Sequence, residues 1–258
     1  MNVVVCVKQI PDPNAPGKLD DATRRLTRDG VDVVLDPGDE HAVEAALVVA
    51  EQHGGEVTVV SMGPPRAVDA IRKALSMGAA RGVHVQDPAL QNSDALSTAR
   101  VLAAAVKAQP FDLIVTGQES TDGYSGAVPG QMAELLGLPL LSFAKKLTVE
   151  GGKVLIHRQT DEGYDVVEAP LPAVVTVTGG INEPRYPSLR GIMQSKNKEV
   201  KQLALKDLGL DGQAGGSAAT QEVVALEAAQ ARKAGRVIED KGEAAKEIAD
   251  FLAGLKVI

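Results

Sequence analysis

Residues 111–131 read FDLIVTGQESTDGYSGAVPGQ, and this stretch shows most clearly how the first half of the chain is built. The apolar run 111–116 is short and bounded by loop residues, so it predicts a buried strand. A long glycine-rich loop follows it, and a helical pattern continues over 126–136. A buried strand that ends in such a loop and opens a helix is typical of a parallel sheet covered by helices.

The same alternation of apolar strands and helical patterns precedes this stretch. Strands are predicted at 3–7, 57–61, 83–85, 111–116 and 174–177, and helices at 39–52, 67–77, 94–108 and 126–136. Gly78 is a suitable stop for the second of these helices. Strands that alternate with helices of this length indicate a parallel, helix-covered sheet.

Antiparallel strands are expected beyond residue 142. Residues 144–149, 153–159 and 164–169 alternate apolar and polar positions, and glycine-containing turns separate them. Residues 18–35 indicate one more hairpin, with Leu26 before an Asp29-Gly30 turn and residues 31–35 after it. We therefore predict an α/β fold with a mostly parallel, Rossmann-like sheet and antiparallel hairpin additions.

The last seventy or so residues lose this pattern. Residues 211–221 are rich in glycine and predict a linker. Residues 241–254 predict a helix whose apolar face contains Ala244, Ile248, Phe251, Leu252 and Leu255. An amphipathic helix behind a linker either docks on a partner or packs on its own domain.

Composition excludes several classes of protein. The 258 residues are 44% apolar and 24% charged with a net charge of -7, which suits a globular domain and disfavours nucleic-acid binding. With no tryptophan, three tyrosines and three phenylalanines, the chain is not expected to sandwich a base or a flavin ring by itself. No apolar run could span a membrane and the start shows no signal peptide, so we expect a cytoplasmic protein, or one processed before this numbering begins, that is not membrane-embedded. The single Cys6 is expected to be a buried structural thiol.

The loop 116–131 is the strongest candidate for a binding site. Open α/β sheets bind ligands at this edge, and glycines let backbone N–H groups approach an anion. No Lys-Ser or Lys-Thr pair follows and the spacing is not GxGxxG, so a phosphate or pyrophosphate cradle of another kind is favoured over a plain turn. Segments 6–12, 36–39 and 61–64 end other strands at the same edge. We expect all four to converge on one nucleotide crevice.

The sequence offers no conventional catalytic motif. None of the four histidines has a metal-ligand spacing, and Ser125 does not lie in a G-x-S-x-G elbow. The hairpin carboxylates are expected to form a solvated turn; they are Asp161, Glu162, Asp165 and Glu168. The residues therefore indicate binding rather than bond-breaking chemistry.

Residues 180–198 form a further distinct segment. Two prolines keep its entry extended, and Ser188 is a good N-cap for a short helix. Leu189, Ile192 and Met193 share one face of that helix, and basic residues follow. Such a face suits a protein-docking element. Core packing beside a solvated basic turn is the alternative that the residues alone favour.

Together these residues resemble the electron transfer flavoprotein beta subunit family. The resemblance runs from Val3 to about Leu210, with a weaker match in the tail. It rests on segments that occur in the same order: 7–9, 70–79, 117–131, 171–176 and 182–187. So many ordered matches make the resemblance specific, although each alone is weak.

The resemblance implies a heterodimer of alpha and beta subunits that carries electrons and is not a conventional enzyme. FAD would lie mostly in the alpha subunit, near the surface of this chain, and this chain would hold AMP. Acyl-CoA dehydrogenases of fatty acid oxidation and related dehydrogenases would be transient donors, and a quinone oxidoreductase or another protein would be the acceptor. Residues 1–200 would form the nucleotide-binding domain with a recognition loop. Residues 201–258 would form a linker and a C-terminal arm or helix that docks on the alpha subunit.

The resemblance also implies site residues, with no catalytic residue and no metal ligand among them. The cofactor-binding positions are Cys6, Asp36, Pro37, Gly38, Asp39, Met62, Gly123, Tyr124, Ser125, Gly126, Ala127, Val128, Pro129, Gly130, Gln131, Met132, Ala133 and Glu134. The partner-docking positions are Pro184, Arg185, Tyr186, Leu189, Ile192, Met193 and Lys196, with Leu189 in the place of the family's anchoring leucine.

Two departures keep alternatives open. Asp165 stands where the family often has a glutamate thought to touch the mobile flavin domain, and Tyr124-Ser125-Gly126 replaces acidic or threonine residues. Some relatives bind a second FAD in the same pocket and bifurcate electrons. A free-standing regulator that binds AMP or ATP, similar to universal stress proteins, would share the sheet and the phosphate loop. It would not need the segment 182–198.

Overall fold

The computed structural model describes residues 1–15, 17–28, 30–227, 235 and 237–258. The chain divides into two compact units, Met1–Val224 and Ala225–Ile258, and each is described by itself.

A nine-stranded mixed sheet forms the centre of the first unit, in the order β11-β10-β9-β12-β8-β1-β6-β7-β13. In that order the strands are Tyr164–Pro170, Lys153–Gln159, Leu140–Glu150, Ala173–Val177, Leu113–Gly117, Asn2–Cys6, Glu56–Met62, Arg81–Val85 and Val200–Leu203. Neighbours from β9 to β13 pair in parallel, and β9, β10 and β11 pair antiparallel. The predicted mixed α/β sheet and its antiparallel meander are therefore confirmed.

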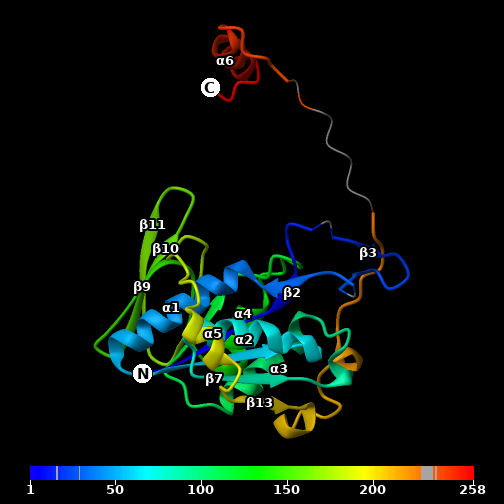
Figure 1. Cartoon of the computed structure of the whole chain (residues 1–258), viewed down its shortest axis with the longest axis vertical. Helices are drawn as coiled ribbons and strands as arrows, with labels where there is room; N and C mark the ends of the chain where they lie inside the picture. Colours follow the sequence, from blue (N-terminus) through cyan, green and yellow to red (C-terminus); the bar gives the residue numbers. More distant parts are fainter. Residues whose placement is uncertain (16, 29, 228–234, 236) are drawn as a thin grey trace. The chain divides into compact units, whose positions relative to one another are not determined.

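Helices cover both faces of the parallel part (Figure 1). They are α1 (Pro37–His53), α2 (Val68–Met77), α3 (Ala95–Lys107), α4 (Val128–Leu136) and the short α5 (Leu189–Ser195), with 3-10 turns η1 (Pro65–Ala67), η2 (Pro88–Leu90), η3 (Leu205–Leu208) and η4 (Gly216–Ala218). Val3 and Val5 pack with α1 and α2, whereas Val4 packs with α3 and α4. Because successive side chains point to opposite faces, strands covered on both faces are apolar throughout.

Side-chain caps fix where two of the helices begin. Asp36 precedes α1 and accepts a hydrogen bond from the Gly38 nitrogen at 2.9 Å. Asp94 precedes α3 and accepts one from the Ser97 nitrogen at 2.7 Å. Such caps satisfy first-turn N–H groups that have no partner within the helix. Gly78 follows α2 with φ of 143°, as expected of a glycine that ends a helix.

The hairpin predicted for residues 18–35 is paired differently. Val33–Leu35 (β5) pairs antiparallel with Gln9–Pro11 (β2), and Leu19–Asp20 (β3) pairs with Arg25–Leu26 (β4). The first pairing buries Ile10 and Leu35, which a hairpin within 18–35 would not achieve. The predicted turn residue Asp29 lies outside the described residues.

Residues 211–221 pack closely instead of forming a free linker. Ala214 is buried, and the Ser97 hydroxyl both accepts from the Gly215 nitrogen at 2.7 Å and donates to the Gly215 carbonyl at 3.1 Å. A Cβ on Gly215 would lie 2.2 Å from the Ala89 carbonyl oxygen. Glycine here permits close backbone approach rather than flexibility.

The second unit contains α6 (Ala244–Gly254), which confirms the predicted last helix. Its apolar residues Ile248 and Phe251 are exposed, as is Leu255 directly after it. No helix among the described residues is long and apolar enough to cross a membrane.

Candidate functional site

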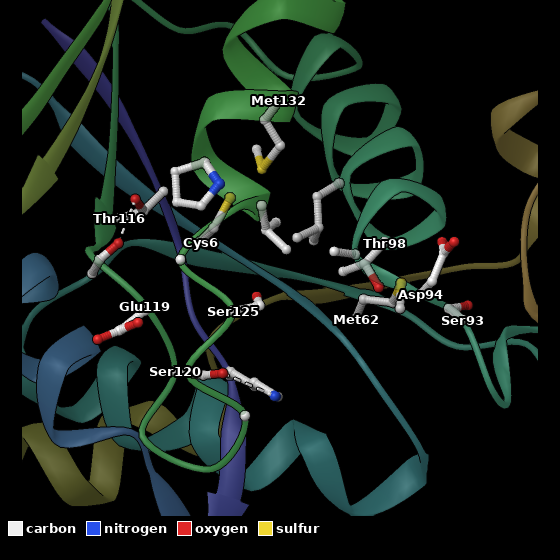
Figure 2. A pocket seen from close by; sticks show the side chains of 18 of the residues that line it. Cys6, Met62, Ser93, Asp94, Thr98, Thr116, Glu119, Ser120, Ser125 and Met132 are labelled. Atoms are coloured by element: carbon white, nitrogen blue, oxygen red, sulfur yellow. Dashed lines mark hydrogen bonds between the residues drawn. The ribbon is translucent and has the colours of Figure 1, made fainter. Parts of the chain in front are cut away.

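A cavity of about 910 Å³ opens at the carboxyl ends of β1, β6 and β8 (Figure 2). Cys6 and Lys8 line it after β1, Asp39 at the start of α1, and Met62 at the end of β6. The loop after β8 contributes residues from Thr116 to Met132. The four predicted segments therefore converge on one crevice, although segment 36–39 follows β5 of a separate small sheet.

The glycine-rich loop forms one wall of this cavity. Gly123, Ser125 and Gly126 line it, and Figure 2 shows Ser120 and Ser125 on the same loop. Tyr124 and Gly126 have φ values of 47° and 59°, so the backbone turns sharply here. No side-chain hydrogen bond caps α4 at Ala127, and Pro129 has no N–H, so Val128 and Gly130 supply the first-turn N–H groups that could bind an anion.

Three cations lie around the cavity. The Lys8 ammonium donates to Asp122 at 2.6 Å and to Ser120 at 3.1 Å, and Arg28 donates to Asp122 at 2.5 Å. Burial alone would raise the pKa of Asp122, but the Lys8 charge and these hydrogen bonds hold it below the usual carboxyl range. Arg25 also lines the cavity and forms no ion pair with the described residues, so its charge is available to a ligand.

Two buried carboxyl groups underlie the loops. Asp36 accepts from the Thr121 nitrogen at 2.7 Å and ties the loop to the start of α1. Asp39 accepts from the Lys8 nitrogen at 2.7 Å. Burial, and secondly the charge of Asp36, raises the pKa of Asp39 to about 8.

The remaining wall is apolar and suits a flat ring. It is lined by Met62, Leu90, Leu102, Val128 and Met132, and none of the described phenylalanines and tyrosines lines the cavity. Cys6 lies here as a buried thiol, and burial raises its pKa to about 12. The confirmed burial of Cys6 makes it part of the packing and not a reactive thiolate.

An adenine nucleotide fits these residues. The volume lies within the range of roughly 300–1,000 Å³ that small-molecule pockets occupy. The apolar wall can hold the base, and the glycine-rich loop, Ser125 and Arg25 can hold phosphate oxygens. No group of three or more metal-ligating side chains is found among the described residues.

The structure brings together only some of the predicted cofactor-binding residues. Those that line the cavity are Cys6, Asp39, Met62, Gly123, Ser125, Gly126, Val128, Pro129 and Met132. The others do not line it: Asp36, Pro37, Gly38, Tyr124, Ala127, Gly130, Gln131, Ala133 and Glu134. Asp36 instead supports the loop from behind, and Tyr124 is exposed.

Several lining residues were missed from the sequence. They are Arg25, Arg28, Leu90, Asn92, Ser93, Asp94, Ala95, Thr98, Leu102 and residues 221–223. An N-cap pattern at Asp94 was a usable signal, because it places the start of another helix beside the same sheet edge. The segment 221–223 carried no such signal.

The predicted docking residues lie together on another surface. Tyr186, Leu189 and Met193 are 96%, 82% and 72% exposed, and Ile192 and Lys196 are exposed beside them. Ser188 caps α5 by accepting from the Gly191 nitrogen at 3.0 Å, as predicted. These exposed apolar side chains exclude the alternative of core packing.

Arg185 is held within the chain. Its guanidinium donates to Glu44 at 2.8 and 3.0 Å and to Glu51 at 2.6 and 3.1 Å. Hydrogen bonds to Glu51 and then to Glu44 raise the pKa of Arg185. Arg185 thus fastens the docking segment to α1, next to half-buried Pro184.

Asp165 lies on β11, opposite Arg158 of β10, and is exposed. Beside it, the Tyr164 ring stacks on His157 with centroids 4.5 Å apart. This hairpin therefore presents an acidic and an aromatic side chain to solvent.

Comparisons with known proteins agree with this arrangement. A family model described as "Electron transfer flavoprotein domain" matches residues 23–208. "Electron transfer flavoprotein subunit beta" of Mycobacterium tuberculosis is 44% identical over 264 aligned residues, which cover 100% of this chain and 99% of that protein. The protein of the same name from Thermoanaerobacterium thermosaccharolyticum is 36% identical over 239 residues, covering 92% of each chain. "Caffeyl-CoA reductase-Etf complex subunit CarD" of Acetobacterium woodii is 37% identical over 218 residues, covering 84% of this chain and 83% of that protein.

Proposed function

Because the chain belongs to the electron transfer flavoprotein family as a beta subunit, we propose that it shuttles electrons in a heterodimer with the alpha subunit. Acyl-CoA dehydrogenases of fatty acid oxidation and related dehydrogenases are the donors. A quinone oxidoreductase or another protein is the acceptor, and the complex works in the cytoplasm.

In this proposal FAD, shared with the alpha subunit, supplies the redox chemistry when bound. This chain supplies the scaffold, a nucleotide site and a docking surface. We place AMP in the cavity, with its base against Met62, Leu102 and Met132. Its phosphate lies against the glycine-rich loop, within reach of Arg25.

The exposed apolar face of α5 is the observation that carries the proposal. Leu189 and Met193 are mostly exposed although the rest of the segment is fastened to α1 and α2. A free-standing nucleotide-binding regulator has no use for a rigidly held apolar projection. A carrier that must bring flavins of two proteins close together requires a transient contact of this kind.

The C-terminal helix supports the heterodimer. The apolar residues of α6 are exposed within their own unit, so they are available to another surface. We assign that surface to the alpha subunit. The alternative is that a second FAD replaces AMP in the cavity and that the complex bifurcates electrons. The volume of the cavity and the arginines that line it are reasons to test this alternative directly.

The test is to co-express the chain with its alpha subunit, purify the complex, denature it and quantify the released nucleotides. One FAD and one AMP per heterodimer are expected. Two FAD and no AMP would assign the cavity to a second flavin. A self-associated chain that carries only AMP or ATP, with no flavoprotein partner, would overturn the proposal in favour of a regulator.

A further inference from the structure

Helices α2 and α5 hold each other through their carboxyl ends. Arg72 of α2 donates to the Ser195 carbonyl at 2.5 Å and to the Lys198 carbonyl at 2.7 Å, at the end of α5. Lys198, just past α5, donates to the Leu75 carbonyl at 2.9 Å and to the Ala79 carbonyl at 2.6 Å, at the end of α2. Each helix therefore receives its C-terminal cap from a cation of the other.

The two helices also touch backbone to backbone. A Cβ on Gly191 would lie 2.4 Å from the Ser76 carbonyl oxygen, so only glycine allows α5 to lie this close to α2 (Figure 1). Ser195 is buried on the same side of α5. The side of α5 that carries Leu189 and Met193 is left exposed.

A helix this short is not stable by itself in water. Its entry is fastened to α1, where the Asn182 amide donates to the His41 carbonyl at 3.0 Å and Arg185 binds Glu44. Its exit is fastened by Lys198, whose ammonium forms no ion pair with the described residues. Lys198 is half-buried and its ammonium is directed at these two carbonyls, and burial lowers its pKa.

We propose that Arg72 and Lys198 are positioning residues for partner docking: their exchanged caps hold α5 in its binding conformation before the dehydrogenase arrives. The inference rests on the proposed function, since it assumes that Leu189 and its neighbours form the docking face. A preorganised face spares the complex the ordering cost that a mobile segment would pay on binding. Loss of a cap raises the KM for the heterodimer and leaves the electron-transfer step itself unchanged.

The first experiment needs no dehydrogenase. In the FAD-loaded heterodimer, amide hydrogen exchange over residues 190–198 is compared for the wild type, Arg72→Met, Lys198→Met and Lys198→Arg. Exchange is expected to quicken in the two methionine variants, and arginine at position 198 should restore most of the protection. The matched control is Lys201→Met, because Lys201 is exposed on the neighbouring strand β13. Unchanged exchange in both methionine variants would overturn the inference.

The second experiment measures docking with a purified acyl-CoA dehydrogenase and its acyl-CoA substrate, with the heterodimer as electron acceptor. Lys198→Met and Arg72→Met should raise the KM about tenfold with kcat and FAD content unchanged. Leu189→Ala is run in parallel. If it raises the KM and the two methionine variants do not, only this inference is wrong. If Leu189→Ala leaves the KM unchanged, the docking function itself is wrong, and the inference fails with it.

Discussion

One carboxylate oxygen of Asp94 holds Thr220 twice, accepting from its backbone nitrogen at 2.6 Å and from its hydroxyl at 3.0 Å. The same oxygen accepts from the Gln221 nitrogen at 3.2 Å, and the other oxygen caps α3 at Ser97. Asp94 therefore joins a wall of the cavity to the last residues of the first unit.

Asp94→Asn should separate these two roles. Asparagine keeps one oxygen for the cap, but its amide NH₂ would face three donors. We expect faster amide exchange at residues 219–223 and a loss of about 1–2 kcal/mol in the free energy of unfolding. Exchange and urea unfolding of the heterodimer measure both. Asp211→Asn, an exposed site, is the control. Equal exchange in the two variants would show that Asp94 does not hold this segment.

Asp39 predicts a pH dependence of stability. Burial, and then the charge of Asp36, raises its pKa from 3.8 to about 8, so the folded chain holds a proton that the unfolded chain has released. Stability should therefore fall as pH rises from the unfolded value toward about 8. Asp39→Asn cannot ionise and should flatten that part of the profile. Urea unfolding between pH 4 and pH 8 measures the free energy of unfolding of both proteins. If it falls with pH as steeply in the variant as in the wild type, Asp39 is not the titrating group.

Arg25 should contribute to phosphate binding. A charge-assisted hydrogen bond to phosphate is worth about 1.5–3 kcal/mol, so Arg25→Gln should weaken AMP binding at least about tenfold. Adenosine, which lacks the phosphate, should bind both proteins equally. Calorimetric titration of the nucleotide-stripped heterodimer measures the affinity for both ligands. The matched control is Lys18→Gln, because Lys18 directly precedes β3, the strand that pairs with β4 and its Arg25. Equal loss of AMP and adenosine affinity would mean that Arg25 acts on the fold and not on phosphate.

Arg185 should matter more for stability through Glu44 than through Glu51. The Glu44 side chain is only 8% exposed, whereas that of Glu51 is 58% exposed. Arg185→Met leaves a buried carboxylate unpaired and should cost about 2–4 kcal/mol, whereas Glu51→Gln should cost about 0–1 kcal/mol. Thermal and urea unfolding of the heterodimer compare them. Similar losses in both variants would contradict this ranking.

Leu189→Ala should weaken coupling to the dehydrogenase without unfolding the chain, because Leu189 is 82% exposed and packs little within it. A KM increase of about tenfold is expected for removal of an apolar anchor, which is about 1.4 kcal/mol. Ser142→Ala, outside the docking segment, serves as the control. If Leu189→Ala keeps the wild-type KM and a full content of FAD, Leu189 does not dock the dehydrogenase.

The sheet could be predicted because local composition determines it. Runs such as Val3 to Val7 are apolar at every position, which is typical of strands that helices cover on both faces. Glycine-rich turns separate the antiparallel strands of the meander. The pairing of Val33–Leu35 with Gln9–Pro11 could not be predicted. The Asp-Gly turn is a local signal for a hairpin, whereas the burial of Ile10 depends on contacts between segments far apart in the sequence.

The part of the site at the strand ends was predicted from the sequence, whereas the residues contributed by 90–102 and 221–223 were not. Residues at the carboxyl ends of parallel strands must meet, so the convergence of segments 6–12, 61–64 and the loop followed from strand order, whereas Cys6, Asp39 and Met62 were implied by the family resemblance. Gln221 is held at the cavity by Asp94, and Val223 by Arg24; both partners lie more than a hundred positions away. Glycines 215 and 216 resembled a flexible linker, yet they allow close packing against the carbonyls of Ala89 and Gln91.

The buried thiol of Cys6 makes the chain convenient for site-specific fluorescence. It is the single cysteine, and its raised pKa of about 12 keeps it protonated and unreactive toward maleimides at neutral pH. A cysteine placed at Tyr186, which is 96% exposed beside Leu189, would then take up dye at one site of this chain. The arrival and departure of each redox partner could be timed from that position, without any change to the flavin.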